Sequence, residues 1–240
     1  MPAPSVHDLK QRCRGISAGI YAAPLGALAD STRKLADWGG RLIHFDVMDG
    51  FFVPQMTAGP DFVAALDTNL ARDVHLMVAR PEAHVLPFAK AGADIITVHA
   101  EAPGAAEALA AIPQAAAELD RPILAGLALM PGTPIESVMP LLDPVPDLIL
   151  VLALDPREKA PPRITDAAMR AQAIKEMVAT ARPLVAIDGG ITEATIAEAA
   201  AAEPDIIVSG SAIFRASDPA ATFRRLSDAM RHPAIDGAPA

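Results

Sequence analysis

Eight short apolar runs recur along this 240-residue chain, and alanine-rich segments of helical character lie between them. Strands that alternate with helices are typical of parallel βαβ units. Eight such units in a chain of this length predict an α/β fold, a single (β/α)8 TIM barrel, and an open doubly wound sheet is the alternative. The expected strands are residues 16–21, 42–48, 73–78, 95–99, 123–129, 148–154, 184–187 and 206–209, and the clearest expected helices are 105–119, 166–181 and 193–202.

No linker interrupts this pattern, so we expect one domain over residues 1–240, with peripheral ends at about 1–14 and 232–240. The net charge of −9 disfavours a nucleic-acid partner or an anionic membrane, since both require a basic face. The single cysteine, Cys13, excludes an intrachain disulfide and is typical of the cytoplasm. We find no signal-peptide core and no apolar run of about 18 residues, so no membrane partner is expected.

Polar side chains mark the ends of three expected strands. His44 and Asp46 end the second strand and share one face with Met48, because side chains alternate along a strand. His75 lies in the third strand, and Asp188 follows the seventh. Active sites of (β/α)8 barrels gather at the carboxyl ends of the strands, so we expect these residues to converge.

Two histidines and two carboxylates offer mixed nitrogen and oxygen ligands to a divalent metal cation, and Zn²⁺, Fe²⁺, Mn²⁺ and Co²⁺ all fit such a set. The candidate ligands are His44, Asp46, His75 and Asp188. Such a cation polarises a substrate carbonyl and stabilises an enediolate, while Asp46 and Asp188 act as base and acid on opposite faces. The alternative is structural: hydrogen-bonded core histidines, with Asp188 capping the next helix.

The motif HFDVMDGFFVP at residues 44–54 resembles the signature of ribulose-phosphate 3-epimerases. The similarity continues through Thr57, Gly59 and Pro60, although Gln55 replaces the usual asparagine. Further matches, in the family's order, are HLMV at 75–78, PGT at 131–133, DGGI at 188–191 and SGSAIF at 209–214.

The resemblance implies a metal-dependent isomerase that epimerises C3 of a ketopentose 5-phosphate on a (β/α)8 barrel, with D-ribulose 5-phosphate and D-xylulose 5-phosphate as the expected pair. It places the metal ligands on His44, Asp46, His75 and Asp188, and the acid/base carboxylates on Asp46 and Asp188. It also implies a small sugar phosphate as the partner and self-association into a homo-oligomer.

The resemblance further implies that Met48 and Met77 line the substrate site, although methionines also fill gaps in cores. Glycine-rich loops after the seventh and eighth strands are suited to phosphate, because their backbone N–H groups are accessible there. The expected substrate-binding residues are Met48, Met77, Gly189, Gly190, Gly210 and Ser211.

The chain departs from the family after the sixth expected strand. A Pro-Gly-Phe-Gly-Gly-Gln loop is replaced by DPREKAPPR at residues 155–163, and proline lacks a backbone donor. Arg157, Lys159 or Arg163 either supplies the missing phosphate contact by charge or belongs to a solvated loop.

Two smaller departures concern the first and sixth expected strands. Leu152 replaces a family methionine, and Gly19 falls on a substrate-contacting serine, for which Ser17 is a substitute. The alternatives are therefore an epimerase for another ketose phosphate and a barrel that binds a ligand without catalysis. A sugar-acid-phosphate lyase is disfavoured, because the second strand lacks the lysine of an Asp-x-Lys-x-x-Asp pattern.

Overall fold

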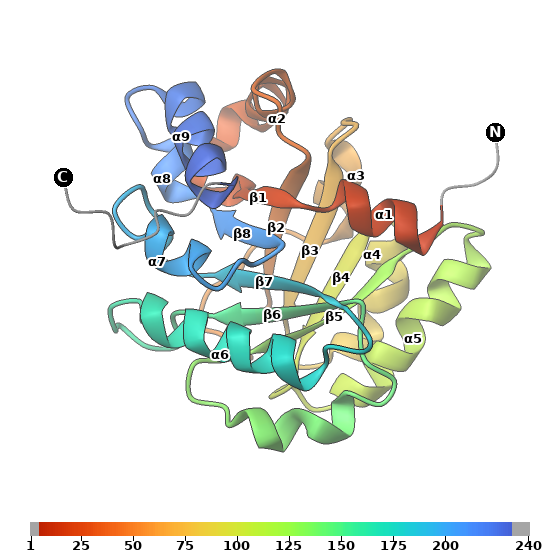
Figure 1. The fold of residues 1–240 in the computed structure, drawn as a ribbon. Helices are drawn as coiled ribbons and strands as arrows, with labels where there is room; N and C mark the ends of the chain where they lie inside the picture. The colour runs from red at the N-terminus through yellow and green to blue at the C-terminus, as the bar shows by residue number, and fades with distance from the viewer. Residues whose placement is uncertain (1–4, 232–240) are drawn as a thin grey trace.

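The computed structural model describes residues 5–231, and its eight parallel strands close into a barrel in sequence order, β1 to β8 (Figure 1). The predicted (β/α)8 barrel is thereby confirmed. The strands are β1 (Gly15–Gly19), β2 (Leu42–Met48), β3 (Ala71–Met77), β4 (Ile95–His99), β5 (Leu124–Leu129), β6 (Leu148–Leu152), β7 (Leu184–Asp188) and β8 (Ile206–Ser209).

Helices surround the barrel (Figure 1). The α-helices are α1 (Val6–Arg12), α2 (Leu28–Asp37), α3 (Pro60–Ala65), α4 (Val85–Lys90), α5 (Ala105–Glu118), α6 (Ile164–Met177), α7 (Ile196–Ala200), α8 (Ser211–Phe214) and α9 (Pro219–Arg231), and the 3₁₀ helices are η1 (Ile20–Ala22), η2 (Leu25–Ala27), η3 (Pro81–Ala83) and η4 (Ile135–Leu141). The segment between β5 and β6 forms only the 3₁₀ helix η4, and Pro140 inside it lacks the N–H group that an α-helix needs there. No helix within residues 5–231 is long and apolar enough to cross a membrane.

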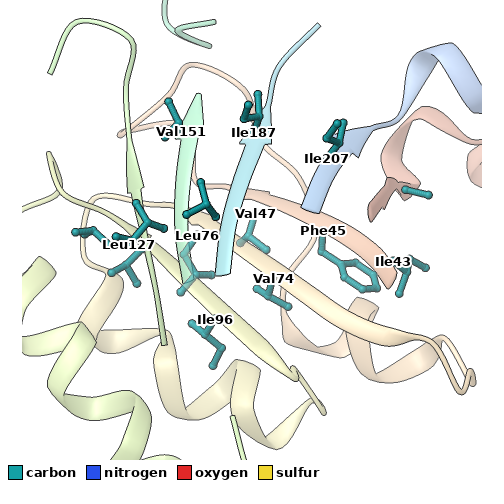
Figure 2. Packing of buried hydrophobic residues seen from close by; sticks show 14 of the residues in the cluster. Ile43, Phe45, Val47, Val74, Leu76, Ile96, Leu127, Val151, Ile187 and Ile207 are labelled. Carbon is teal, nitrogen blue, oxygen red and sulfur yellow. The ribbon is translucent and has the colours of Figure 1, made fainter. Parts of the chain in front are cut away.

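Apolar side chains on the outer faces of the strands pack against the helices. Figure 2 shows Ile43, Phe45 and Val47 of β2 within this layer, and all three are buried. Because side chains alternate along a strand, Leu42, His44 and Asp46 must point into the barrel. The packing of the outer face of β2 on the helices therefore directs His44 and Asp46 into the barrel.

Helix α1 closes the amino end of the barrel. Its residue Leu9, and Cys13 just after it, belong to the cluster of buried side chains inside the barrel. Ion pairs join Lys10 to Asp147 (2.8 Å) and Arg12 to Asp94 (3.1 Å), and both aspartates directly precede strands. The N-terminal segment thus packs onto the barrel through Leu9 and Cys13, whereas the predicted peripheral end at 232–240 lies outside the described residues.

Candidate metal centre and active site

Four polar side chains converge inside the barrel at the carboxyl ends of β2, β3 and β7. One ligand atom from each of His44, Asp46, His75 and Asp188 can be chosen so that all four atoms lie within 4.8 Å of one another. The pairing of β2 with β3 sets Asp46 beside His75, which explains the meeting of residues 29 positions apart. The predicted convergence is therefore present.

The two histidines face this cluster through different nitrogens. His44 directs Nε2 toward it, 3.1 Å from Asp46 Oδ1 and 3.8 Å from Asp188 Oδ2. His75 directs Nδ1, at 3.2 Å from Asp46 Oδ1 and 3.8 Å from Asp188 Oδ2. Both imidazoles are buried, and a contact to the second nitrogen of each ring holds that ring in one orientation.

The second nitrogen of His44 contacts a buried carboxylate that the sequence analysis missed. Nδ1 lies 2.8 Å from Asp73 Oδ2, and the Ser17 hydroxyl donates to the same oxygen at 2.8 Å. Ser17 is fully buried in this contact, and its substitution for the family's substrate-contacting serine stays a prediction from the sequence. Asp73 lies two residues before His75, and this spacing on one strand face was the available signal.

The second nitrogen of His75 contacts another histidine. Its Nε2 lies 2.8 Å from His99 Nε2, and His99 Nδ1 lies 3.0 Å from Glu101 Oε2. The sequence analysis missed both residues. His99 ends β4, so the criterion that selected His44 and His75, a polar side chain near the end of a strand, would also have selected His99.

The two carboxyl groups of the cluster have opposite protonation tendencies. Burial raises the pKa of Asp188 to about 7, and the charge of Asp46 adds to this effect. Burial also acts to raise the pKa of Asp46, but His44 and His75 outweigh it and hold that pKa well below its usual range. Without a cation, Asp46 is thus ionised at neutral pH, whereas Asp188 becomes mostly protonated only as the pH falls below about 7.

The arrangement fits a divalent cation. Two imidazole nitrogens and two carboxylate oxygens are suitable ligands, and the opposite nitrogen of each histidine already has a partner. The set also fits proton transfer, since two carboxyl groups flank one small volume.

The two predicted methionines lie next to this cluster. Met48 and Met77 are register partners at the ends of β2 and β3, on the same strand faces as Asp46 and His75. Thr57 fixes the end of β2: its hydroxyl donates to Asp46 O at 2.7 Å and accepts from Met48 N at 2.9 Å. Leu152, which replaces the family methionine of the sixth strand, is paired with Asp188 and buried.

The predicted glycines lie in the loops after β7 and β8. Gly189 and Gly190 have positive φ values of 109° and 73°, which favour glycine. Gly210 and Ser211 follow β8, and the Ser209 hydroxyl joins the two loops by donating to Ile191 O at 2.9 Å. The structure therefore brings these loops together at the carboxyl end of the barrel.

Close backbone packing accounts for the glycine at the first-strand position. A Cβ atom on Gly19 would lie 3.2 Å from the Cα of Gly210, and one on Gly210 would lie 2.9 Å from the carbonyl oxygen of Gly19. The approach of β1 to the loop after β8 thus disfavours a serine at residue 19.

The unusual loop after β6 folds over the glycine pair of the β7 loop. A Cβ atom on Gly190 would lie 2.5 Å from Pro162, so that proline packs directly on the Gly190 backbone. Arg157 forms an ion pair with Asp155, with 2.6 Å between Nη2 and Oδ2, while Lys159 and Arg163 are exposed. The side chain of Gln55 also reaches this loop and donates to Pro156 O at 3.2 Å.

Known proteins resemble this chain in sequence and in fold. The model of the "Ribulose-phosphate 3 epimerase family" matches residues 15–214. A ribulose-phosphate 3-epimerase from Mycobacterium tuberculosis is 38% identical over 219 residues, covering 88% of this chain and 90% of that protein. The chloroplastic ribulose-5-phosphate-3-epimerase of Arabidopsis thaliana is 34% identical over 232 residues, covering 92% of this chain and 78% of that protein.

Solved structures support the fold alone. KGPDC from Streptococcus mutans has a TM-score of 0.66 at 16% identity, covering 92% of this chain and 99% of that one. A 3-hexulose-6-phosphate synthase from Salmonella typhimurium has a TM-score of 0.63 at 18% identity, with 91% and 99% covered. From the sequence matches over most of its length, this chain belongs to the ribulose-phosphate 3-epimerase family.

Proposed function

We propose that this protein is a metal-dependent isomerase that inverts C3 of a ketose phosphate, converting D-ribulose 5-phosphate to D-xylulose 5-phosphate. The observation that carries the proposal is the convergence of His44, Asp46, His75 and Asp188 in a family member. These four residues are the proposed metal ligands. A bound divalent cation supplies positive charge that polarises a carbonyl and stabilises an adjacent enediolate.

Asp46 and Asp188 are the proposed catalytic residues, one on each face of the substrate. One carboxylate takes the proton from C3, and the electrons of the broken C–H bond move toward the neighbouring C2 carbonyl. The other carboxyl then gives a proton to the opposite face of C3, which inverts that carbon. Their positions on β2 and β7, with ligand oxygens within 4.8 Å, support this two-sided transfer.

Substrate binding is proposed for residues around this cluster. Met48 and Met77 provide apolar contact beside the reacting carbons, and the loops of Gly189, Gly190, Gly210 and Ser211 hold the phosphate. The hydrogen bond from the Ser209 hydroxyl at the end of β8 to Ile191 O in the β7 loop supports this proposal, because it brings the two loops together.

An epimerase for another ketose phosphate is the second candidate, and the loop after β6 favours it. Pro162 covers Gly190, and Arg157 is paired with Asp155. Both features alter the surroundings of the proposed phosphate site. Self-association and a cytoplasmic location stay predictions from the sequence.

Proton NMR in D2O tests the reaction with the metal-loaded protein and D-ribulose 5-phosphate. We expect deuterium at C3 together with formation of D-xylulose 5-phosphate, and no exchange after the metal is removed with a chelator. If metal-loaded protein gives no exchange, the ribulose assignment is wrong, and other ketose phosphates become the substrates to screen.

Metal analysis tests the ligand set. His75→Ala removes one nitrogen from the cluster, so we expect weaker retention of Zn²⁺ during dialysis. An exposed histidine, His7, offers the matched control His7→Ala, which should retain the metal as the wild type does. Equal retention by His75→Ala would remove His75 from the proposed ligands.

A further inference from the structure

A chain of hydrogen-bonding groups extends from His75 away from the Asp46 and Asp188 cluster. The Nε2 atoms of His75 and His99 are 2.8 Å apart, with ring centroids 4.9 Å apart and ring planes inclined by only 25°. The two nitrogens are much closer to each other than the two ring centroids are. The nearly parallel rings therefore meet edge to edge. Both rings are fully buried, so each depends on the other as a hydrogen-bond partner.

The far end of this chain is a carboxylate with a fixed orientation. Glu101 Oε1 accepts hydrogen bonds from Met130 N, at 2.8 Å, and from the Thr133 hydroxyl, which leaves Oε2 for His99 Nδ1 at 3.0 Å. Burial alone would raise the pKa of Glu101, but hydrogen bonds from His99 and Thr133 lower it to about 2. Glu101 is therefore an ionised group that only accepts hydrogen bonds.

The loop that binds Glu101 is itself held in place by an arginine from α6. Arg170 donates to the carbonyl oxygens of Pro131 at 2.8 Å and Thr133 at 2.6 Å. The position of the Glu101 carboxylate is thus set by β5, its loop and α6 together.

The positions of the protons follow from these contacts. A carboxylate only accepts, so His99 places its proton on Nδ1 and keeps a lone pair on Nε2. Two imidazole nitrogens 2.8 Å apart share one proton, so His75 must donate from Nε2. The Nδ1 atom of His75, 3.2 Å from Asp46 Oδ1, then directs a lone pair at the cluster, where a bound cation would accept it.

We propose that Glu101, acting through His99, sets the tautomer of His75 so that Nδ1 is its metal-binding nitrogen. The inference rests on the proposed metal site, and it adds two positioning residues that lie outside the four ligands. His44 has the complementary arrangement, in which Asp73 contacts Nδ1 and Nε2 faces the cluster. A carboxylate thus orients each imidazole, directly for His44 and through a second ring for His75.

The variant Glu101→Gln tests this inference with almost no change in shape. Met130 N and Thr133 both donate to the side chain at residue 101, so they will hold the oxygen of the new amide. Its NH2 group must then face His99 Nδ1 and donate to it. This reverses the hydrogen-bond chain and favours a proton on His75 Nδ1, in the position that the metal needs.

Two measurements follow the change. NMR of ¹⁵N-histidine-labelled, metal-free protein distinguishes protonated from unprotonated ring nitrogens. We expect His99 Nδ1 to be protonated in the wild type and unprotonated in Glu101→Gln. Competition with a chelating dye gives the Zn²⁺ affinity, which should fall by about 10- to 100-fold in the variant.

A matched control makes the same chemical change on the exposed side of α5. Glu107→Gln should leave both the His99 signal and the Zn²⁺ affinity unchanged. His99→Phe removes the acceptor for His75 Nε2 while keeping a flat ring, and it should weaken Zn²⁺ binding at least as much as Glu101→Gln.

The outcomes separate this inference from the proposed function. An unprotonated His99 Nδ1 in the wild type overturns the inference without any variant. A Zn²⁺ affinity of Glu101→Gln within about twofold of the wild type also overturns it, even where turnover is normal. A wild-type protein that binds no divalent metal refutes the proposed metal site itself, whatever the His99 signal.

Discussion

The two ends of the barrel interior differ in chemistry although the same strands build both. At the amino end, Leu42, Leu124 and Leu184 pack with Leu9 and Cys13 of the N-terminal segment. A few residues farther along the same strand faces, the interior becomes polar. On β2 this change takes four residues, from Leu42 through His44 to Asp46.

Burial has opposite energetic consequences at the two ends of the barrel interior. Burying an apolar side chain stabilises the fold by about 25 cal/mol per Å². Burying an imidazole or a carboxylate costs free energy unless hydrogen bonds or ions replace the lost water. We therefore expect changes at the amino end to affect stability, and changes at the carboxyl end to affect activity and metal binding.

The largest expected effect is that of Asp188→Asn at the carboxyl end. An amide cannot exchange the C3 proton, so isotope exchange followed by NMR should fall by about 10²- to 10⁴-fold. The fold should persist with an unchanged or higher Tm, because burial and the charge of Asp46 already disfavour ionised Asp188. Normal turnover in this variant would refute the two-carboxylate mechanism.

The opposite behaviour is expected of Leu124→Ala at the amino end. Leu124 is fully buried, and the cavity left by its truncation should lower the free energy of unfolding by about 2–5 kcal/mol. Urea denaturation measures this change, while kcat of the folded fraction should match the wild type. A lower kcat at full folding would show that the two ends are coupled.

A smaller effect is expected when a support of the metal cluster is changed. Asp73→Asn keeps the size of the side chain but removes the charge that orients His44, so Zn²⁺ affinity should fall by about 10- to 100-fold. Asp37→Asn, on an exposed position of α2, is the control. Equal affinities would mean that Asp73 is only a buried structural residue.

The smallest effect is expected for Ser17→Ala, one contact farther from the cluster. The variant loses a single hydrogen bond to Asp73, which keeps its contact with His44. The free energy of unfolding, measured by urea denaturation, should fall by about 1 kcal/mol. A Zn²⁺ affinity as weak as that of Asp73→Asn would contradict the expectation that the effect on metal binding declines with distance from the cluster.

The expected strands agree closely with the barrel, although some ends differ. The first strand ends at Gly19, where Ile20 and Tyr21 enter η1, and the sixth ends at Leu152. These ends depend on hydrogen bonds to neighbouring strands, which the local pattern does not contain. The grouping of His44, Asp46 and Met48 on one face was predictable, because alternation along a strand is a local property.

The residue pattern alone was sufficient to predict the eight alternating strands, the family and the four residues that converge. Which atoms meet became known from the folded barrel, because contacts across strands depend on register and barrel closure. Register places Asp46 beside His75, and closure brings Gly19 against Gly210. The contact of His99 with His75 and the packing of Pro162 on Gly190 likewise join segments that are distant in the chain. The physical reason is that strand periodicity acts over two residues, whereas the partners of a buried polar atom come from the whole barrel.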